Sequence, residues 1–177
     1  MALDATKTKV GVAGGIYVAP LGTALPTDQT TALDAAFAEV GYITDDGVSL
    51  AINESINDIV AWQNADVVRK IQTSHDVTFG FSMLELNDVS RELFFGNYTS
   101  GATGVSELTG DVLPQQVAVL EILDGDTKIR AVIPIAQVTE REDITIGSSD
   151  AITLGVTLTA FPDASGVKAY LYDGAAS

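Results

Sequence analysis

The chain has 177 residues and a formal net charge of −15, from nine Lys and Arg against 24 Asp and Glu. This charge argues against a protein that grips nucleic acid, because such binding needs clusters of basic side chains on the phosphates. The chain has no cysteine, which excludes disulfides, thiolate metal sites and cysteine nucleophiles. With 46% apolar and 19% charged residues, the composition is that of a folded chain rather than a disordered one.

The length favours a single domain over residues 1–177, with residues 1–14 as a flexible N-terminal arm and no additional C-terminal domain. The N-terminus lacks the basic start and apolar core of a secretory signal. No run approaches the ~20 apolar residues that would span a bilayer. We therefore expect a protein made in a cytoplasm, with no membrane partner.

The first third of the chain predicts a strand, a loop and a short helix. The strand covers residues 11–20, and the Thr- and Pro-rich residues 23–30 form an ordered surface loop. A capping-box pattern at residues 31–34, with Asp34 in place of the usual Glu, begins the helix, and Gly41 ends it. Its apolar side chains at helical spacing are Leu33, Phe37 and Val40.

A second short helix is predicted after a long strand. Asn87 or Asp88 provides the N-cap, Val89 and Leu93 lie four residues apart, and Gly96 ends the helix. The Gly-rich residues 100–110 are expected to form a long loop.

The remaining segments alternate with period two, which predicts strands. Asp124-Gly125 between two apolar runs favours a type I′ turn and therefore a hairpin. Repeated half-polar strands predict a mostly β fold, an antiparallel β-sandwich or barrel with one or two short flanking α-helices. The predicted strands cover residues 77–84, 116–123, 128–138, 152–161 and 167–172.

No catalytic, metal or cofactor site emerges from the motifs. His75 lies between Ser74 and Asp76, but neighbouring strand residues point to opposite faces, and a triad needs convergence in space. The Asp-Gly pairs at residues 45–47 and 124–126 lack the spaced ligands of a calcium loop and favour turns. Residues 11–15 lack a dinucleotide-binding fingerprint, and the carboxylates of residues 140–143 are typical of a solvated turn. We expect no enzyme and no cofactor.

Residues 56–68 contain the only tryptophan of the chain, Trp62, among polar residues. One interpretation is ordinary core packing. The other is a projecting loop that anchors a partner, as aromatic hot spots do. On that interpretation the side chains in contact between subunits are Ile59, Trp62, Val67 and Val68.

Two strands carry Thr, Ser and Gly on one face, where a solvated face usually carries Lys and Glu. Such faces are either simply exposed, or they line a space or contact a neighbouring subunit. As the lining of a channel, the candidate residues are Asp76, Thr78, Ser82, Thr153, Thr157 and Thr159.

The order and spacing of several segments resemble the major tail tube proteins of long, non-contractile-tailed phages. The resemblance is good over at least residues 15–95, and the remainder matches in strand order. The segments that carry it are residues 20–23 (PLGT), 25–28 (LPTD), 41–48 (GYITDDGV), 59–62 (IVAW), 67–73 (VVRKIQT), 78–85 (TFGFSMLE) and 132–138 (VIPIAQV).

The resemblance implies a structural virion protein, with a β-sandwich-like protomer and a helix on its side. Protomers would form hexameric rings that stack into a tube, a conduit for DNA ejection. Contractile-tail tubes and type VI secretion tubes share this architecture, but the loop and helix segments favour the non-contractile group. The implied partners are further copies of the chain, and tape-measure, tail-tip and tail-terminator proteins. DNA would transit the lumen without specific binding, which suits an acidic wall.

A second function class stays open on the sequence alone: a monomeric acidic β-sandwich that binds a carbohydrate or a protein. It requires an exposed aromatic platform, and one Trp with five scattered Tyr does not identify one. A hydrolase around His75 is a more distant alternative.

Overall fold

The computed structural model describes residues 3, 7–99 and 104–175. Within these residues it contains ten strands and one helix, so the predicted mostly β, antiparallel fold is confirmed. The strands before the helix are β1 (Ala13–Pro20), β2 (Ala38–Glu39), β3 (Ile43–Val60) and β4 (Val67–Met83). After helix α1 (Asp88–Phe95) come β5 (Tyr98–Thr99), β6 (Val105–Ser106), β7 (Gln116–Asp124), β8 (Thr127–Arg141), β9 (Leu154–Phe161) and β10 (Tyr170–Ala175).

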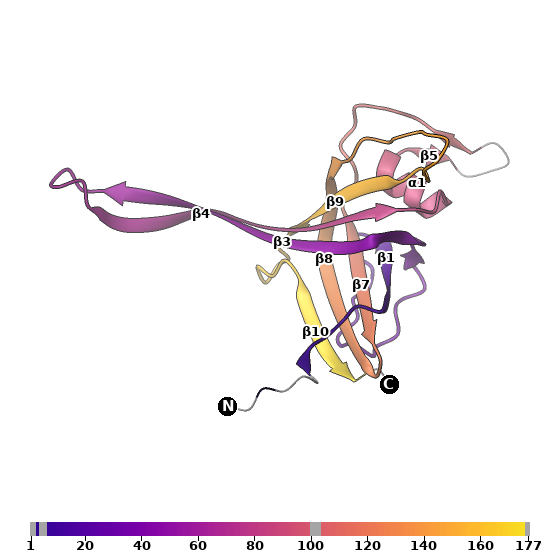
Figure 1. Ribbon diagram of the computed structural model, residues 1–177, viewed down its shortest axis with the longest axis horizontal. Helices are drawn as coiled ribbons and strands as arrows, with labels where there is room; N and C mark the ends of the chain where they lie inside the picture. The colour runs from indigo at the N-terminus through magenta and orange to yellow at the C-terminus, as the bar shows by residue number, and fades with distance from the viewer. Residues whose placement is uncertain (1–2, 4–6, 100–103, 176–177) are drawn as a thin grey trace.

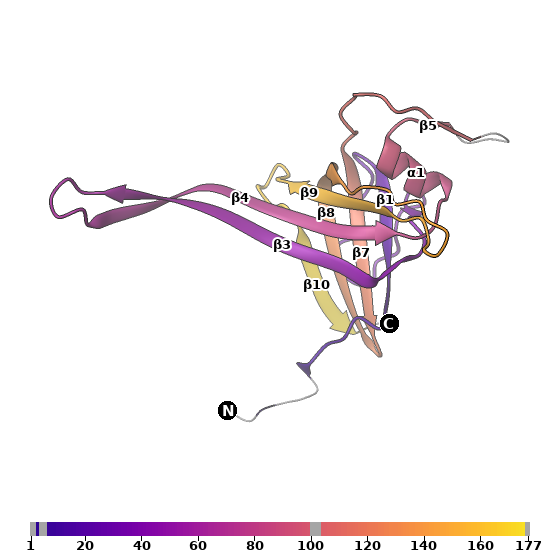
Figure 2. The ribbon, with the colours of Figure 1, turned by 45° about the horizontal axis from the view of Figure 1, so that its top comes forward.

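The main sheet has the strand order β2-β1-β7-β8-β9-β4-β3, and every pairing is antiparallel. β8 belongs to both layers of the sandwich, because β10 pairs with its first half and β9 with its second half. Figures 1 and 2 show β9, β4 and β3 running across the direction of β7, β8 and β10. The apolar faces of the two layers therefore enclose one core.

The core follows the period-two alternation of the strands. The odd-numbered residues of β4 from Val77 to Met83 are buried, as are the even-numbered residues of β9 from Leu154 to Ala160. They pack against Ile16, Ile133 and other side chains of β1, β7 and β8. Burying one face of each strand fixes its register, because a slip of one residue would expose the apolar set.

Helix α1 begins and ends where its caps predict. The Asn87 side chain accepts a hydrogen bond from the Ser90 backbone N–H at 2.8 Å, and its amide donates to Val40 O at 2.8 Å. Gly96, at φ 81°, ends the helix and donates its N–H to Glu92 O. Leu93 and Phe94 are buried in the core, so α1 covers one end of the sandwich.

The helix predicted over residues 31–40 is wrong. The Thr31 carbonyl accepts a hydrogen bond from buried Arg130 at 2.7 Å instead of from the next helical turn. The Asp34 side chain accepts from the Ala36 N–H, so it forms a local turn that competes with a helix. Ala38 and Glu39 then pair with β1. Tertiary contacts and Asp chemistry thus outweigh the apolar spacing.

The predicted hairpin at Asp124-Gly125 is confirmed: β7 and β8 pair up to Asp124 and Thr127, with Gly125 at φ 56°. The last strand begins three residues later than predicted, because Asp163 accepts hydrogen bonds from Ser165 and Val167 and holds a turn before it. In the predicted loop 100–110, residues 100–103 lie outside the described residues, and Val105 and Ser106 form β6. Of the expected N-terminal arm, residues 1–2 and 4–6 lie outside them too.

Candidate assembly surfaces

A long two-stranded extension leaves the body of the molecule. β4 pairs with β9 only between Val77 and Met83, whereas β3 and β4 stay paired from Ser49 and Gly80 out to Val60 and Val67. We call residues 53–76 the projecting hairpin; it reaches roughly 30 Å at 3.3 Å per residue. Figure 1 shows it extending away from the sandwich, at the opposite side from α1. Since a two-stranded ribbon has no core of its own, its side chains remain accessible.

The outer end of the hairpin (residues 59–72) exposes apolar side chains. Trp62 is 96% exposed, so the core-packing interpretation of this segment is wrong. The structure brings the four side chains predicted to contact other subunits together on this outer end. All four are exposed: Ile59, Trp62, Val67 and Val68.

A tight loop holds Trp62 in this position. The Ala61 N–H donates to Asp66 O at 2.8 Å and closes the loop. Inside it, Asn64 and Ala65 have φ values of 60° and 54°. Positive φ is unfavourable for Ala, and such strain is concentrated at functional segments.

The apolar stripe of the core also continues onto β3, at the edge of the body. Leu50 and Ile52 pair with Phe79 and Val77, yet they are 46% and 61% exposed. They line one side of an open groove of about 250 Å³ whose other side includes Lys168 and Leu171. The sequence reasoning missed this stripe, although alternation along residues 48–52 carries the signal.

The opposite face of β3, β4 and β9 carries small and polar side chains; we call it the small-residue face. Thr78 lies directly opposite Thr159, and Gly80 directly opposite Thr157. The predicted lining residues Asp76, Thr78, Ser82, Thr157 and Thr159 share this face, and Thr153 lies just before β9. The face consists of Ser49, Ala51, Asn53, Asp76, Thr78, Gly80, Ser82, Gly155, Thr157 and Thr159.

The alternative chemical sites do not converge in the structure. His75 pairs with Glu54, its Nε2 3.8 Å from Glu54 Oε1, on the face opposite Ser74 and Asp76. The turn predicted at residues 45–47 is wrong, because they lie within β3 at a register shift in its pairing with β4. Residues 124–126 form the β7–β8 turn as predicted. Among the described residues, no group of three or more His, Cys, Asp or Glu side chains is arranged to hold a metal ion.

A buried ion pair, between Arg130 and Glu121, stabilises the sandwich beside these surfaces. Arg130 is 2% exposed and donates to Glu121 Oε1 from Nε at 2.9 Å and from Nη2 at 2.5 Å. Its Nη1 donates to the carbonyls of Asp28 and Thr31, which ties the loop of residues 23–37 to β8. Hydrogen bonds from the Thr31 and Thr30 backbone and side chains lower the pKa of the Asp28 carboxyl to about 2.

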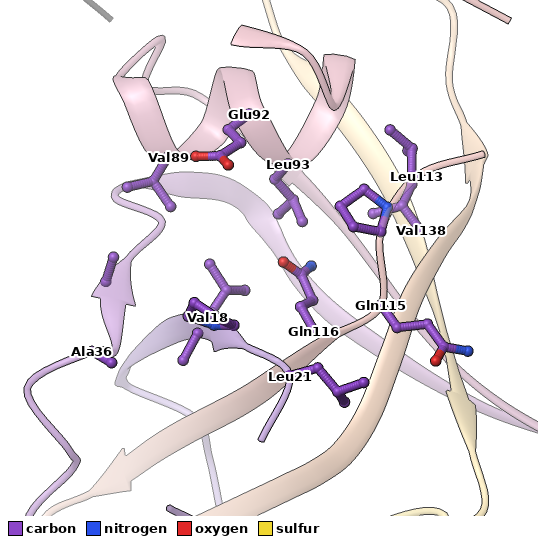
Figure 3. Close-up of a pocket in the computed structure, with 14 residues that line it drawn as sticks. Val18, Leu21, Ala36, Val89, Glu92, Leu93, Leu113, Gln115, Gln116 and Val138 are labelled. Atoms are coloured by element: carbon purple, nitrogen blue, oxygen red, sulfur yellow. The ribbon is translucent and has the colours of Figure 1, made fainter. Parts of the chain in front are cut away.

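A second hollow lies between α1 and the ends of β1 and β7; we call it the α1 pocket. Its volume is about 340 Å³. Figure 3 shows Val89, Glu92 and Leu93 of α1 facing Val18 and Gln116 across it. Its walls are mainly apolar, and Glu92 and Gln116 supply polar groups. No motif in the sequence marked this pocket.

These surfaces are candidates for contacts with other chains, and the comparison with known families agrees. Residues 1–172 match the model of the family described as phage tail tube protein. The chain belongs to the phage tail tube protein family. It is therefore a structural, non-enzymatic component of the virion tail, and tail tube proteins assemble with copies of themselves into a tube.

Among solved structures, one that matches this tail tube protein is titled "Crystal structure of Hcp protein". The two share 12% identity and a TM-score of 0.36, and the match covers 91% of this chain and 98% of that one. A TM-score this low does not establish a common fold. No curated protein matches the sequence. Among the described residues, no helix is long and apolar enough to cross a membrane.

Proposed function

We propose that this tail tube protein forms hexameric rings that stack into the tube of a long, non-contractile-tailed phage, through which DNA is ejected. The observation that carries the proposal is the projecting hairpin, which places exposed apolar side chains roughly 30 Å from the body that folds around the core. An exposed apolar cluster of this kind marks a protein–protein interface. The family supplies the partner, which is another copy of the chain.

Contacts between subunits use the projecting hairpin and the open edge of β3. β3 is the last strand of the main sheet and pairs only with β4 over the described residues. An unpaired strand edge offers backbone donors and acceptors to a neighbouring chain. Head-to-tail contacts that close produce rings, and stacked rings produce a tube. Extensive contacts are needed because subunits of charge −15 repel one another.

The small-residue face lines the lumen. It lies opposite the face that packs under α1, so a ring with its helices outside presents this face inward. Small side chains leave the channel wide. Glu142 supplies a negative charge at this face that repels phosphate, and its Oε2 accepts a hydrogen bond from Ser82 at 3.2 Å. Asp76 is the other acidic side chain at this face, and its Oδ1 lies 3.6 Å from Lys168 Nζ. DNA therefore slides without specific binding.

Further partners follow from this assignment. A tape-measure protein fills the lumen before ejection, and tail-tip and tail-terminator proteins contact the end rings. The protein is made in the host bacterial cytoplasm and resides in the virion tail.

Electron microscopy and light scattering over a concentration and salt series test the assembly. We expect rings and tubes, with added salt favouring them because it screens the repulsion between subunits. A protein that stays monomeric at millimolar concentration in added salt would overturn the proposal.

The lumen assignment has a separate test. The double variant Thr78→Lys/Thr157→Lys should still form tubes, since both side chains are only half-buried. These tubes, unlike the wild type, should take up short duplex DNA, and uptake should fall steeply with salt. Density for DNA confined to the outer wall would refute the lumen assignment and leave the tube intact.

A further inference from the structure

We infer that the outer end of the projecting hairpin docks into the α1 pocket of a neighbouring copy, with Trp62 as the side chain that enters it. The inference rests on the proposed function, because it names the two surfaces that meet when subunits assemble. It commits to a second copy of this chain as the occupant of the pocket.

The two surfaces match in shape and polarity. A 96% exposed indole has most of its area to gain from burial, and the pocket offers about 340 Å³ between apolar walls. The indole N–H is a donor that needs an acceptor when buried. Glu92 and Gln116 place a carboxylate and an amide at this pocket (Figure 3).

The charges of the two surfaces also permit contact. Arg69 and Lys70 are balanced by Asp66 and by Asp58, which lies opposite Lys70 with its Oδ1 2.8 Å from Lys70 Nζ, so this end of the hairpin is neutral in a chain of −15. The remainder of the chain, which includes the pocket with Glu92, is therefore strongly acidic. A surface without net charge avoids much of the repulsion that acts between two acidic copies.

The contact forms between copies and not within one chain. The hairpin and α1 lie at opposite sides of the molecule in both ribbon views (Figures 1 and 2). The outer end at one side and the α1 pocket at the other make a head-to-tail contact, which propagates from copy to copy. The closed loop around Trp62 keeps the outer end in one conformation, which lowers the entropic cost of docking.

Cross-linking tests the docking directly, because the chain has no native cysteine. Gln63→Cys lies beside Trp62, and Gln115→Cys lies at the pocket; both positions are exposed. The two single variants are mixed with excess wild-type protein and oxidised under assembly conditions. The control pairs Gln63→Cys with Asp126→Cys, an exposed position at the far end of β7, roughly 25 Å from Gln116.

The inference predicts a Gln63→Cys/Gln115→Cys dimer at a yield at least severalfold above the control pair. Tubes with no such excess overturn the docking and leave the proposed function standing. Cross-linked dimers without tubes support the docking and overturn the proposal that the protein forms a tube. Neither dimers nor tubes overturn both.

Fluorescence gives a second measurement, since Trp62 is the only tryptophan. Its emission should shift to the blue when wild-type protein assembles, as the indole leaves water. Glu92→Lys should raise the concentration needed for this shift about tenfold at low salt, and less at high salt. Asp126→Lys makes the same charge change away from the pocket and should alter it by less than twofold. Equal effects of the two variants, or no shift in assembled wild type, would overturn the inference.

Discussion

The strands β3 and β4 run through both the sandwich and the projecting hairpin, yet the contacts that stabilise them differ between the two regions. Along residues 77–83, β4 lies between β3 and β9 and buries Val77, Phe79, Phe81 and Met83. Along residues 67–76, β4 has only β3 beside it, and almost every side chain is exposed. The same alternating apolar pattern therefore stabilises the monomer in one region and remains available to a partner in the other.

The two regions should differ most in the free energy of unfolding that is lost when an apolar side chain is truncated. Phe79 is 3% exposed, and Phe79→Ala should lower the free energy of unfolding by about 3–5 kcal/mol through lost burial and a cavity. Chemical denaturation of the monomer measures this loss. Ile59→Ala on the outer end is the control and should cost less than about 0.5 kcal/mol. Equal losses would refute the division into body and hairpin.

The buried charge network of the body should give the next largest effect. Arg130→Met removes the pair with Glu121 and the hydrogen bonds to the carbonyls of Asp28 and Thr31, and should cost about 3 kcal/mol. Thermal unfolding with calorimetry measures it. Lys128→Met is the control, because Lys128 also pairs with Glu121, at 2.8 Å, but does not bond the loop. If Lys128→Met costs as much, the tie to the loop contributes nothing.

The cap of α1 contributes less. Asn87→Ala removes the hydrogen bonds to Ser90 N and Val40 O and should cost about 1–2 kcal/mol. Denaturant midpoints measure the loss. Asn53→Ala, at an exposed position of the hairpin, should leave the midpoint unchanged, and a similar drop in both variants would contradict the role assigned to the cap.

The loop held by Arg130 should also respond to acid. The pKa of Asp28 is about 2 in the folded protein, below its usual value, because Thr31 and Thr30 donate hydrogen bonds to the carboxylate. A lowered carboxyl pKa stabilises the fold above the unfolded value of about 4, and this contribution is lost as the pH falls through about 2. Stability measured between pH 5 and pH 2 should fall less steeply in Asp28→Ala. Parallel curves would refute the assignment.

Trp62→Ala should have the smallest effect on the monomer. Because the side chain is 96% exposed, unfolding should change by less than about 0.5 kcal/mol, while assembly into tubes should be abolished. Melting curves at low concentration and electron microscopy at high concentration measure the two effects. A monomer that loses several kcal/mol, or tubes that form as in wild type, would contradict the role of the hairpin in assembly.

Local sequence signals determined helix α1, the β7–β8 turn and the strands with one buried face. Asn87 and Gly96 act within a few residues of the backbone groups they satisfy, and Gly125 supplies the positive φ that its turn needs. The net charge of −15 likewise follows from the composition, and the small-residue face follows from the alternation along the strands. These features depend on neighbours along the chain, so they were predictable.

Only the tertiary structure decided which apolar residues are buried. Leu33, Phe37 and Val40 have helical spacing, but Arg130, about a hundred residues further along, bonds the carbonyl of Thr31 and the segment stays irregular. Leu50 and Ile52 alternate as Val77 and Phe79 do, yet they are exposed because β3 is the end strand of the main sheet and an open groove lies beside them. Whether an alternating strand stabilises the monomer or awaits a partner depends on which strands lie beside it, and those are distant in sequence.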